Sequence, residues 1–242
     1  MAVLAHGAAA VSGALAIFVK TPGRSALKTR LAAGTGTAYA QRWYELAAEA
    51  VASVAAQARE QFGLTVYWAV AEAGAESAWT GLPTLAQGDG DLGTRMARVH
   101  SALVERHGFA LLIGADAPQL TASLLGEATR WLAVAGATEP RLSLGPASDG
   151  GFWLFGSNTV VPLQAWTRVG YSQADTANRF HESLRPYGSW QTLATLTDVD
   201  RAGDLKPVQH ALAALAAPTP AQRTLAQWMH DTPAMRDRDA SQ

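Results

Sequence analysis

Short uninterrupted apolar runs recur along the chain, separated by longer segments in which apolar residues follow helical spacing. The runs predict strands over residues 15–20, 64–70, 109–113, 141–144, 152–155 and 190–196. The run at 109–113 is the most apolar and does not alternate with polar residues, which is typical of a strand at the centre of a parallel sheet.

Helical spacing predicts a long amphipathic helix from Thr37 to Gln61, which Gly63 ends. Ser172 has the side chain of a good N-cap, so we expect a helix from there to about Leu184. Further helices are expected over 91–107, 123–135 and 203–216, with a short one around Leu225. Strands and helices thus alternate, which indicates an α/β fold with a mainly parallel sheet and helices on both faces.

The chain has 242 residues, of which 48% are hydrophobic, enough to bury one large core. We therefore expect a single domain over residues 14–217. Residues 1–13 are Ala-rich and contain no Lys or Arg, so we interpret them as a flexible extension and not as a signal peptide. Residues 218–242 are expected to form a short helix followed by a polar, disordered tail.

Charge and composition restrict the function. The 19 Lys and Arg against 20 Asp and Glu give a net charge of −1, which argues against binding to nucleic acid. No apolar run approaches the ~20 residues of a membrane span. The absence of Cys excludes disulfides, thiolate metal sites and Cys nucleophiles, and it fits a cytoplasmic protein.

A cationic loop follows the first predicted strand, in the segment K-T-P-G-R-S-A-L-K-T-R-L at residues 20–31. Pro22 and Gly23 let the backbone turn, so that Lys20, Lys28 and Arg30 can converge on a polyanion. This pattern is typical of a loop that binds phosphate. The alternative is a basic surface loop before a helix.

Acidic residues follow two of the predicted strands. Asp116 comes soon after the central strand, where ligands bind in open α/β sheets, and is a candidate ligand for a divalent cation. Asp198 and Asp200 lie two residues apart, so in extended backbone both carboxylates face the same way, an arrangement that suits Mg²⁺. The structural alternatives are a turn or cap before Pro118 and a solvated turn that closes with Asp204.

Two glycine-containing motifs add further candidates. Asp149 precedes two glycines and an aromatic strand, where the glycines allow either close approach of the backbone to a ligand or simply a turn. In the motif Q-G-D-G-D-L-G-T-R-M, which opens a predicted helix, the candidates for contact with the base or ribose of a nucleotide are Gln87, Asp91 and Arg95. Ordinary helix capping is the alternative for this second motif.

The motifs occur in an order that resembles the radical-SAM/selenodomain-associated transferase 1 family over residues 15–206. They are K-T-P-G-R-S-A-L-K-T-R-L, Q-G-D-G-D-L-G-T-R-M, I-G-A-D-A-P, D-G-G-F-W-L-F-G and T-D-V-D…D-L. The resemblance implies a Rossmann-like nucleotide-diphospho-sugar transferase (GT-A) fold. It also implies glycosyl transfer from a nucleotide-diphosphate sugar to a small acceptor, for which Asp149 is our candidate base.

The cationic loop and the D-V-D segment also resemble those of the phospholactate and phosphoenolpyruvate guanylyltransferases. That resemblance implies a divalent metal, Mg²⁺ or Mn²⁺, on Asp116, Asp198 and Asp200, and nucleotide phosphates on the cations Lys20, Lys28 and Arg30. Nucleotidyl transfer is therefore the alternative reaction, and a nucleotide-binding protein without turnover is a third possibility.

Three residues depart from the family pattern. Ser25 stands where the loop usually has glycine, and Ala115 and Ala117 replace the usual polar residues around the central Asp. Asp116 therefore has no acidic partner two residues away, and any further metal ligand must come from elsewhere in the chain.

Overall fold

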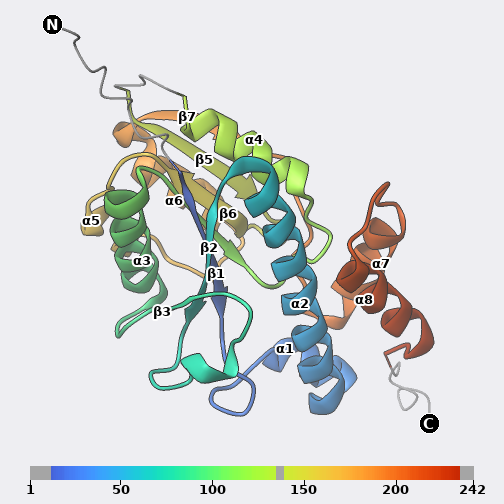
Figure 1. The fold of residues 1–242 in the computed structure, drawn as a ribbon. Helices are drawn as coiled ribbons and strands as arrows, with labels where there is room; N and C mark the ends of the chain where they lie inside the picture. The colour runs from blue at the N-terminus through green and yellow to red at the C-terminus, as the bar shows by residue number, and fades with distance from the viewer. Residues whose placement is uncertain (1–11, 135–138, 235–242) are drawn as a thin grey trace, which may run out of the picture.

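A seven-stranded sheet forms the centre of the protein, with helices packed on both of its faces (Figure 1). The computed structural model describes residues 12–134 and 139–234, so the predicted extension at 1–13 and the end of the predicted tail lie largely outside the described residues. The strands are β1 (Ala14–Val19), β2 (Thr65–Val70), β3 (Thr84–Ala86), β4 (Ala110–Gly114), β5 (Arg141–Pro146), β6 (Phe152–Ser157) and β7 (Ser189–Thr192).

The strand order is β3-β2-β1-β4-β6-β5-β7. The pairs β3–β2, β2–β1, β1–β4 and β5–β7 are parallel, whereas β6 runs antiparallel to both β4 and β5. The predicted α/β fold with a mainly parallel sheet is thus confirmed. From β1 the chain continues to β2 on one side and returns as β4 on the other, which creates a crevice at the carboxyl ends of β1 and β4.

Two helical layers cover the sheet (Figure 1). One buried cluster joins the sheet to α2 (Thr37–Phe62), α4 (Ala122–Leu132), α7 (Leu205–Ala213) and α8 (Pro220–Asp231). A second cluster joins the opposite face to α3 (Leu92–His107), α5 (Leu163–Thr167) and α6 (Thr176–Leu184). Because helices cover both faces, the central strands carry the uninterrupted apolar runs that the sequence shows.

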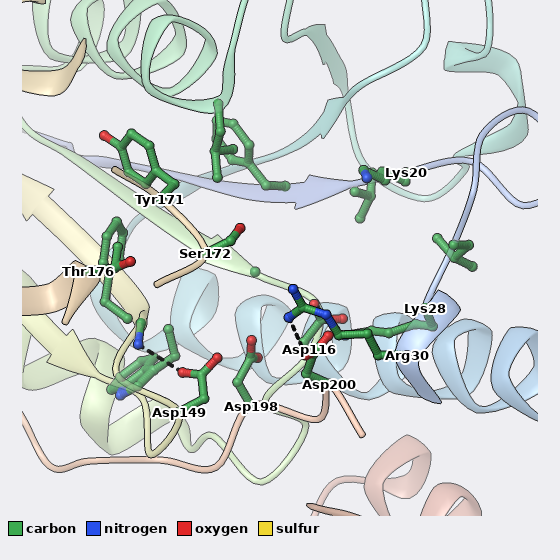
Figure 2. A pocket seen from close by; sticks show the side chains of 18 of the residues that line it. Lys20, Lys28, Arg30, Asp116, Asp149, Tyr171, Ser172, Thr176, Asp198 and Asp200 are labelled. Carbon is green, nitrogen blue, oxygen red and sulfur yellow. Dashed lines mark hydrogen bonds and ion pairs between the residues drawn. The ribbon is translucent and has the colours of Figure 1, made fainter. Parts of the chain in front are cut away.

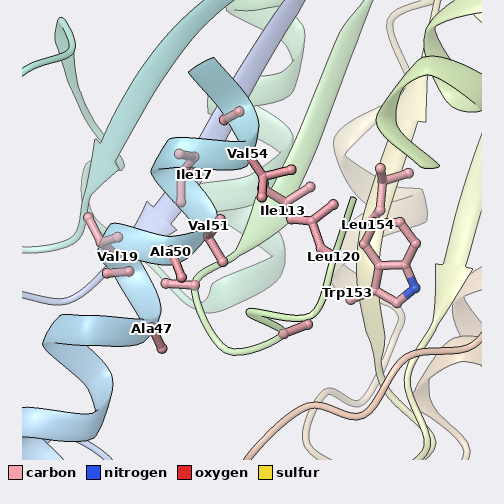
Figure 3. Packing of buried hydrophobic residues seen from close by; sticks show 14 of the residues in the cluster. Ile17, Val19, Ala47, Ala50, Val51, Val54, Ile113, Leu120, Trp153 and Leu154 are labelled. Carbon is pink, nitrogen blue, oxygen red and sulfur yellow. The ribbon is translucent and has the colours of Figure 1, made fainter. Parts of the chain in front are cut away.

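Side chains of β1 alternate between the two clusters. Ile17 and Val19 face the first cluster, where they lie with Val51 and Val54 of α2 (Figure 3). Ala16 faces the second cluster, in which large aromatic side chains of α5 and α6 are fully buried. Both faces of β1 are buried, so the strand holds the loop that follows it in a fixed position.

The prediction that a helix starts at Ser172 is wrong. Helix α6 begins at Thr176 and Asp175 is its N-cap residue, whereas Ser172 has a left-handed backbone with a φ of 62°. Positive φ is incompatible with the extended backbone of an N-cap residue, so Ser172 belongs to the loop before the helix. The long predicted helix, by contrast, is confirmed, since Gly63 ends α2 with a φ of 70°.

The sequence patterns did not predict three short elements: β3, α5 and α1 (Thr29–Thr35). They contain three, five and seven residues, too few for a periodic apolar pattern. The expected last strand, 190–196, is shorter as β7, and Leu196 forms an isolated parallel bridge with Ala147.

The C-terminal helix α8 packs on α2 and on the segment that follows Asp116. Leu225 is fully buried, and the Tyr39 and Trp228 rings lie 4.8 Å apart. The buried Gln222 amide donates to the carbonyl oxygens of Pro118 at 2.8 Å and Leu120 at 2.9 Å. Helix α8 therefore supports the backbone next to Asp116, a predicted site residue. The boundary between a domain at 14–217 and a tail at 218–242 stays a prediction.

None of the helices within the described part of the chain combines the length and the apolar composition needed to cross a bilayer.

Replacing Gln222 with Ala tests this support. The change leaves two buried carbonyl oxygens without their donor and removes the bond from the Thr219 amide to Gln222 Oε1, which is one of the two bonds that cap α8. We expect the free energy of unfolding in urea to fall by roughly 1–3 kcal/mol. The matched control is Gln227→Ala on the exposed face of the same helix, which should change it by no more than about 0.5 kcal/mol. Equal effects of the two variants would contradict the assignment.

Candidate functional site

A cavity of about 800 Å³ opens at the carboxyl ends of β1 and β4. Most of the predicted site residues line it, from segments far apart in the chain (Figure 2). These are Lys20, Lys28, Arg30, Gln87, Asp116, Asp149, Asp198 and Asp200. The structure thus places the cationic loop and the acidic motifs around one cavity, although their individual roles stay predictions.

Asp91 and Arg95 do not line this cavity. Asp91 is the N-cap of α3, and its Oδ1 accepts a hydrogen bond from the Thr94 amide at 2.8 Å. Arg95 Nε donates to the Gly90 carbonyl oxygen at 2.8 Å. Asp91 thus caps α3 and Arg95 binds the loop before it, and of the three candidates in this motif only Gln87 lines the cavity. Their contact with a nucleotide stays a prediction.

Gln87 lies at the end of β3 and is buried. Its Nε2 donates to the carbonyl oxygens of Val19 at 3.3 Å and Ala69 at 2.9 Å. These two bonds fix the orientation of the amide, so that Oε1 remains as the acceptor for any ligand that contacts this side chain.

Lys28 connects three segments of the site. Its ammonium group donates to Asp116 Oδ2 at 2.7 Å and to the Val199 carbonyl oxygen at 2.6 Å, and it lies 5.8 Å from the centre of the Trp43 ring. Only 8% of the side chain is exposed. Burial by itself lowers the pKa of Lys28, but attraction to Asp116, Asp198 and Asp200 outweighs it and raises the pKa. Lys28 is therefore charged at neutral pH, in spite of its burial.

The carboxylates around Lys28 outnumber it. Asp116 Oδ1 is buried and has no hydrogen-bond partner in the structure. Burial, followed by repulsion from Asp116, Asp149 and Asp200, raises the pKa of Asp198 to about 8, although Lys28 partly offsets this shift. An orphaned buried oxygen and a carboxyl that resists ionisation both indicate that the site lacks positive charge.

The other two carboxylates are partly engaged. Asp200 Oδ2 accepts from Arg30 Nη1 at 2.8 Å, and both side chains are partly exposed. Asp149 Oδ1 accepts from the Gly151 amide at 2.9 Å, which leaves its second oxygen free (Figure 2). In the described part of the chain, no three or more His, Asp or Glu side chains are arranged so that they could hold a metal by themselves. Oxygen atoms of a ligand or of water would have to complete any metal site here.

The cationic loop is held in place by Glu72, which follows β2 and which the sequence patterns did not single out. Glu72 accepts hydrogen bonds from the Thr21 amide and the Ser25 hydroxyl, and Trp79 Nε1 donates to Thr21 Oγ1. Partial burial raises the pKa of Glu72, but the bonds from Ser25 and Thr21 outweigh it and lower the pKa. Ser25 therefore anchors the loop to Glu72, which follows β2.

Gly150, which follows Asp149, allows the loop at residues 170–176 to pack closely against it. Gly150 has a φ of 90°, and a Cβ atom there would lie 1.8 Å from the Ala174 carbonyl oxygen. The Ala177 amide donates to the Gly150 carbonyl oxygen at 2.8 Å. This close approach holds residues 170–176 against the cavity and adds Tyr171, Ser172 and Thr176 to its lining. No local pattern in the sequence marks these three residues as part of a site, because a contact between distant segments places them.

Comparison with known proteins shows the family. The sequence profile of the family described as "Uncharacterized protein conserved in bacteria (DUF2064)" matches residues 48–173. No curated protein sequence matches the chain significantly. The narrower resemblance to the radical-SAM/selenodomain-associated transferase 1 family stays a prediction.

Several solved structures are similar to this chain. A candidate nucleotide-diphospho-sugar transferase from Desulfovibrio desulfuricans G20 is similar at a TM-score of 0.76 and 22% identity, covering 90% of this chain and 95% of that one. A 4-diphosphocytidyl-2C-methyl-D-erythritol synthase from Anaerococcus prevotii DSM 20548 has a TM-score of 0.49 and 7% identity, covering 83% and 96%. CMP:2-keto-3-deoxy-manno-octonic acid synthetase in complex with CTP has a TM-score of 0.47 and 13% identity, covering 84% and 98%. The first likeness shows the nucleotide-diphospho-sugar transferase fold.

The raised pKa of Asp198 predicts an unusual pH dependence in metal-free buffer. The proton on Asp198 stabilises the fold fully below the unfolded pKa of 3.8, and this contribution is lost as the pH rises through about 8. We therefore expect the free energy of unfolding, measured with urea in EDTA, to fall between pH 7 and 8.5. This window lies above the unfolded pKa of the buried His100, 6.5, so that group contributes little to the slope.

Asp198→Asn should remove most of this slope and make the metal-free protein more stable at pH 8.5, because a neutral amide replaces a buried anion. The exposed Asp231 on α8 offers a matched control, since Asp231→Asn should leave the slope unchanged. A wild-type protein whose stability is flat or rises over this window would show that Asp198 is already ionised.

Proposed function

The chain belongs to the DUF2064 family, and we propose that it transfers a glycosyl group from a nucleotide-diphosphate sugar to a small acceptor with the help of a divalent cation. The observation that carries the proposal is the buried Lys28–Asp116 pair at the crevice, with an orphaned oxygen on Asp116 and further carboxylates around it. Fixed cations beside hard oxygen ligands suit a metal-bound diphosphate.

The residues present fit a divalent cation. Asp116 offers a buried oxygen without a partner, and ionisation of Asp198 would be favoured by positive charge nearby. We therefore assign Asp116 and Asp198 as protein ligands, with Asp200 available if Arg30 releases it. Because oxygen ligands select Mg²⁺ or Mn²⁺ over softer metals, these are the ions we propose. When bound, such an ion stabilises negative charge on the departing diphosphate.

The chain's own residues supply the rest of the chemistry. The free oxygen of Asp149 takes the proton of the acceptor hydroxyl, whose oxygen then bonds to the anomeric carbon of the donor sugar. The bond from that carbon to the diphosphate breaks, and its electron pair leaves on the nucleoside diphosphate. Lys20, Lys28 and Arg30 line the cavity where this charge develops. Gln87 Oε1 accepts a hydrogen bond from the nucleoside.

Nucleotidyl transfer is the second candidate. It is favoured by the position of both Asp198 and Asp200 around the same cavity as Asp116. In that reaction an oxygen of a small phosphorylated substrate attacks the α-phosphorus of a nucleoside triphosphate, and pyrophosphate leaves. The two candidates differ in the product, which is a nucleoside diphosphate in the first case and pyrophosphate in the second.

A binding panel tests the proposal. Nucleoside triphosphates, nucleotide-diphosphate sugars and nucleoside diphosphates are titrated calorimetrically with and without Mg²⁺ or Mn²⁺. We expect one nucleotide-diphosphate sugar to bind best and only with metal. ³¹P NMR of reaction mixtures then shows whether a nucleoside diphosphate or pyrophosphate is released. Binding of a triphosphate with pyrophosphate as the product would replace the first candidate with the second. Binding without either product would indicate a nucleotide-binding protein.

The variant Lys20→Met tests whether the nucleotide binds in this cavity. Lys20 is exposed and its removal should not disturb the core, but it should weaken binding of the preferred nucleotide about tenfold or more, as a lost charge-assisted bond does. Lys206→Met on α7, an exposed lysine outside the cavity, is the control and should bind normally. If both variants bind as the wild type does, or if no nucleotide binds at all, the phosphate site is wrongly placed.

A further inference from the structure

The charges of the cavity are divided between two sides. Lys20 and Lys28 lie on one side of Asp116 and Asp198, and Tyr171, Ser172 and Thr176 lie on the other (Figure 2). Four cations line the cavity in the described part of the chain: Lys20, Lys28, Arg30 and Arg201. All four come from the cationic loop or from the segment after Asp200, and none comes from residues 149–176, which form the other side.

The side without cations is built from aromatic and hydroxyl groups. Tyr171 is fixed by donation from its hydroxyl to the Trp166 carbonyl oxygen at 2.9 Å, and its ring packs so closely on Gly93 that a Cβ there would lie 2.9 Å from Cε2. The Phe152 ring lies 4.7 Å from that of Phe180. Leu92 of α3, 45% exposed, adds apolar surface to the lining.

The loop at residues 170–176 is held in one conformation. Thr176 Oγ1 donates its hydrogen to the Gln173 carbonyl oxygen at 2.8 Å, lies 3.2 Å from the Gly170 carbonyl oxygen, and accepts from the Gln173 amide at 3.0 Å. Gly150 packs against Ala174 from the other side. These contacts impose the positive φ of Ser172, whose exposed hydroxyl borders the cavity.

Strained backbone marks both sides of the cavity. Among the described residues, only two apart from glycines have positive φ, namely Lys28 at 47° and Ser172 at 62°. Both line this cavity, Lys28 on the cationic side and Ser172 opposite. Left-handed backbone is unfavourable for such residues and persists where the surrounding structure enforces it, commonly at functional sites.

We infer that the side formed by Phe152, Tyr171 and Ser172 is an acceptor subsite for a neutral, hydroxylated molecule with an apolar face, and that it rejects phosphorylated or carboxylated molecules. The aromatic and apolar surfaces provide packing, Ser172 provides a hydrogen bond to a substrate hydroxyl, and Asp149 borders the same side. An anionic acceptor there would face Asp149 and Asp198, and residues 149–176 contribute no cation to the lining. The inference rests on the proposed function and names the class of its second substrate.

A matched pair of probes tests the inference. Phenyl β-glucoside and its 6-phosphate are titrated by NMR into protein that is saturated with metal and with the nucleoside diphosphate that binds best, so that the cationic side is occupied. We expect the neutral probe to bind at least tenfold more tightly than the phosphorylated one. Failure of every nucleoside diphosphate to bind would refute the proposed function itself. Equal binding, tighter binding of the phosphate or binding of neither probe would overturn the subsite.

Two variants locate the effect. Ser172→Gly removes the hydroxyl and relieves the positive φ, so its thermal midpoint should be unchanged or higher while the neutral probe binds about tenfold more weakly and the nucleotide binds normally. Gln173→Lys places a cation on the same loop and should improve binding of the phosphorylated probe at least tenfold. Ser77→Gly and Gln227→Lys, at exposed positions outside the cavity, are the controls. Variants that match their controls would contradict the inference.

Discussion

The ion pair between Lys28 and Asp116 is buried, so both charges lose favourable hydration when the protein folds. The lysine side chain is almost fully buried, and Asp116 Oδ1 has no hydrogen-bond partner. Buried pairs gain little over apolar packing, so stability alone is a poor explanation for this one. Lys28 also holds the Val199 carbonyl oxygen, and the Val199 amide donates to the Asp116 carbonyl oxygen. The pair therefore ties the cationic loop, the end of the central strand and the D-V-D segment into one arrangement.

The fold determines where this pair forms. Because β2 and β4 flank β1 on opposite sides, the loops after β1 and β4 diverge at their carboxyl ends and leave a crevice between them. Other elements then fix the walls of that crevice from outside. Glu72 holds the cationic loop against β2, and Gln222 of α8 holds the backbone after Asp116. Stability of the C-terminal helix and geometry of the site are thus linked through hydrogen bonds that do not touch the cavity.

Sequence patterns could predict the fold and one side of the site for a definite physical reason. Buried parallel strands appear as apolar runs, and the ends of such strands meet at one edge, so Lys28, Asp116 and Asp198 could be grouped before their positions were known. The other side could not be predicted in this way. Ser172 follows the local preferences of an N-cap, but the packing of Gly150 on Ala174, two segments distant in sequence, enforces a different backbone. Glu72 acts through a similar long-range contact.

The two sides of the cavity also differ in the interactions that stabilise their left-handed residues, Lys28 and Ser172. On the cationic side, left-handed Lys28 is compensated by its own charge, through three acidic neighbours and a carbonyl oxygen. On the opposite side, left-handed Ser172 has an exposed side chain, and the compensation comes entirely from its neighbours, chiefly the bonds of Thr176 and the contact at Gly150. A residue whose surroundings maintain its conformation, while its own hydroxyl stays available, is better explained by contact with a ligand than by stability. This asymmetry is the physical reason to regard the cavity as two subsites, one that holds charge and one that recognises a hydroxyl group.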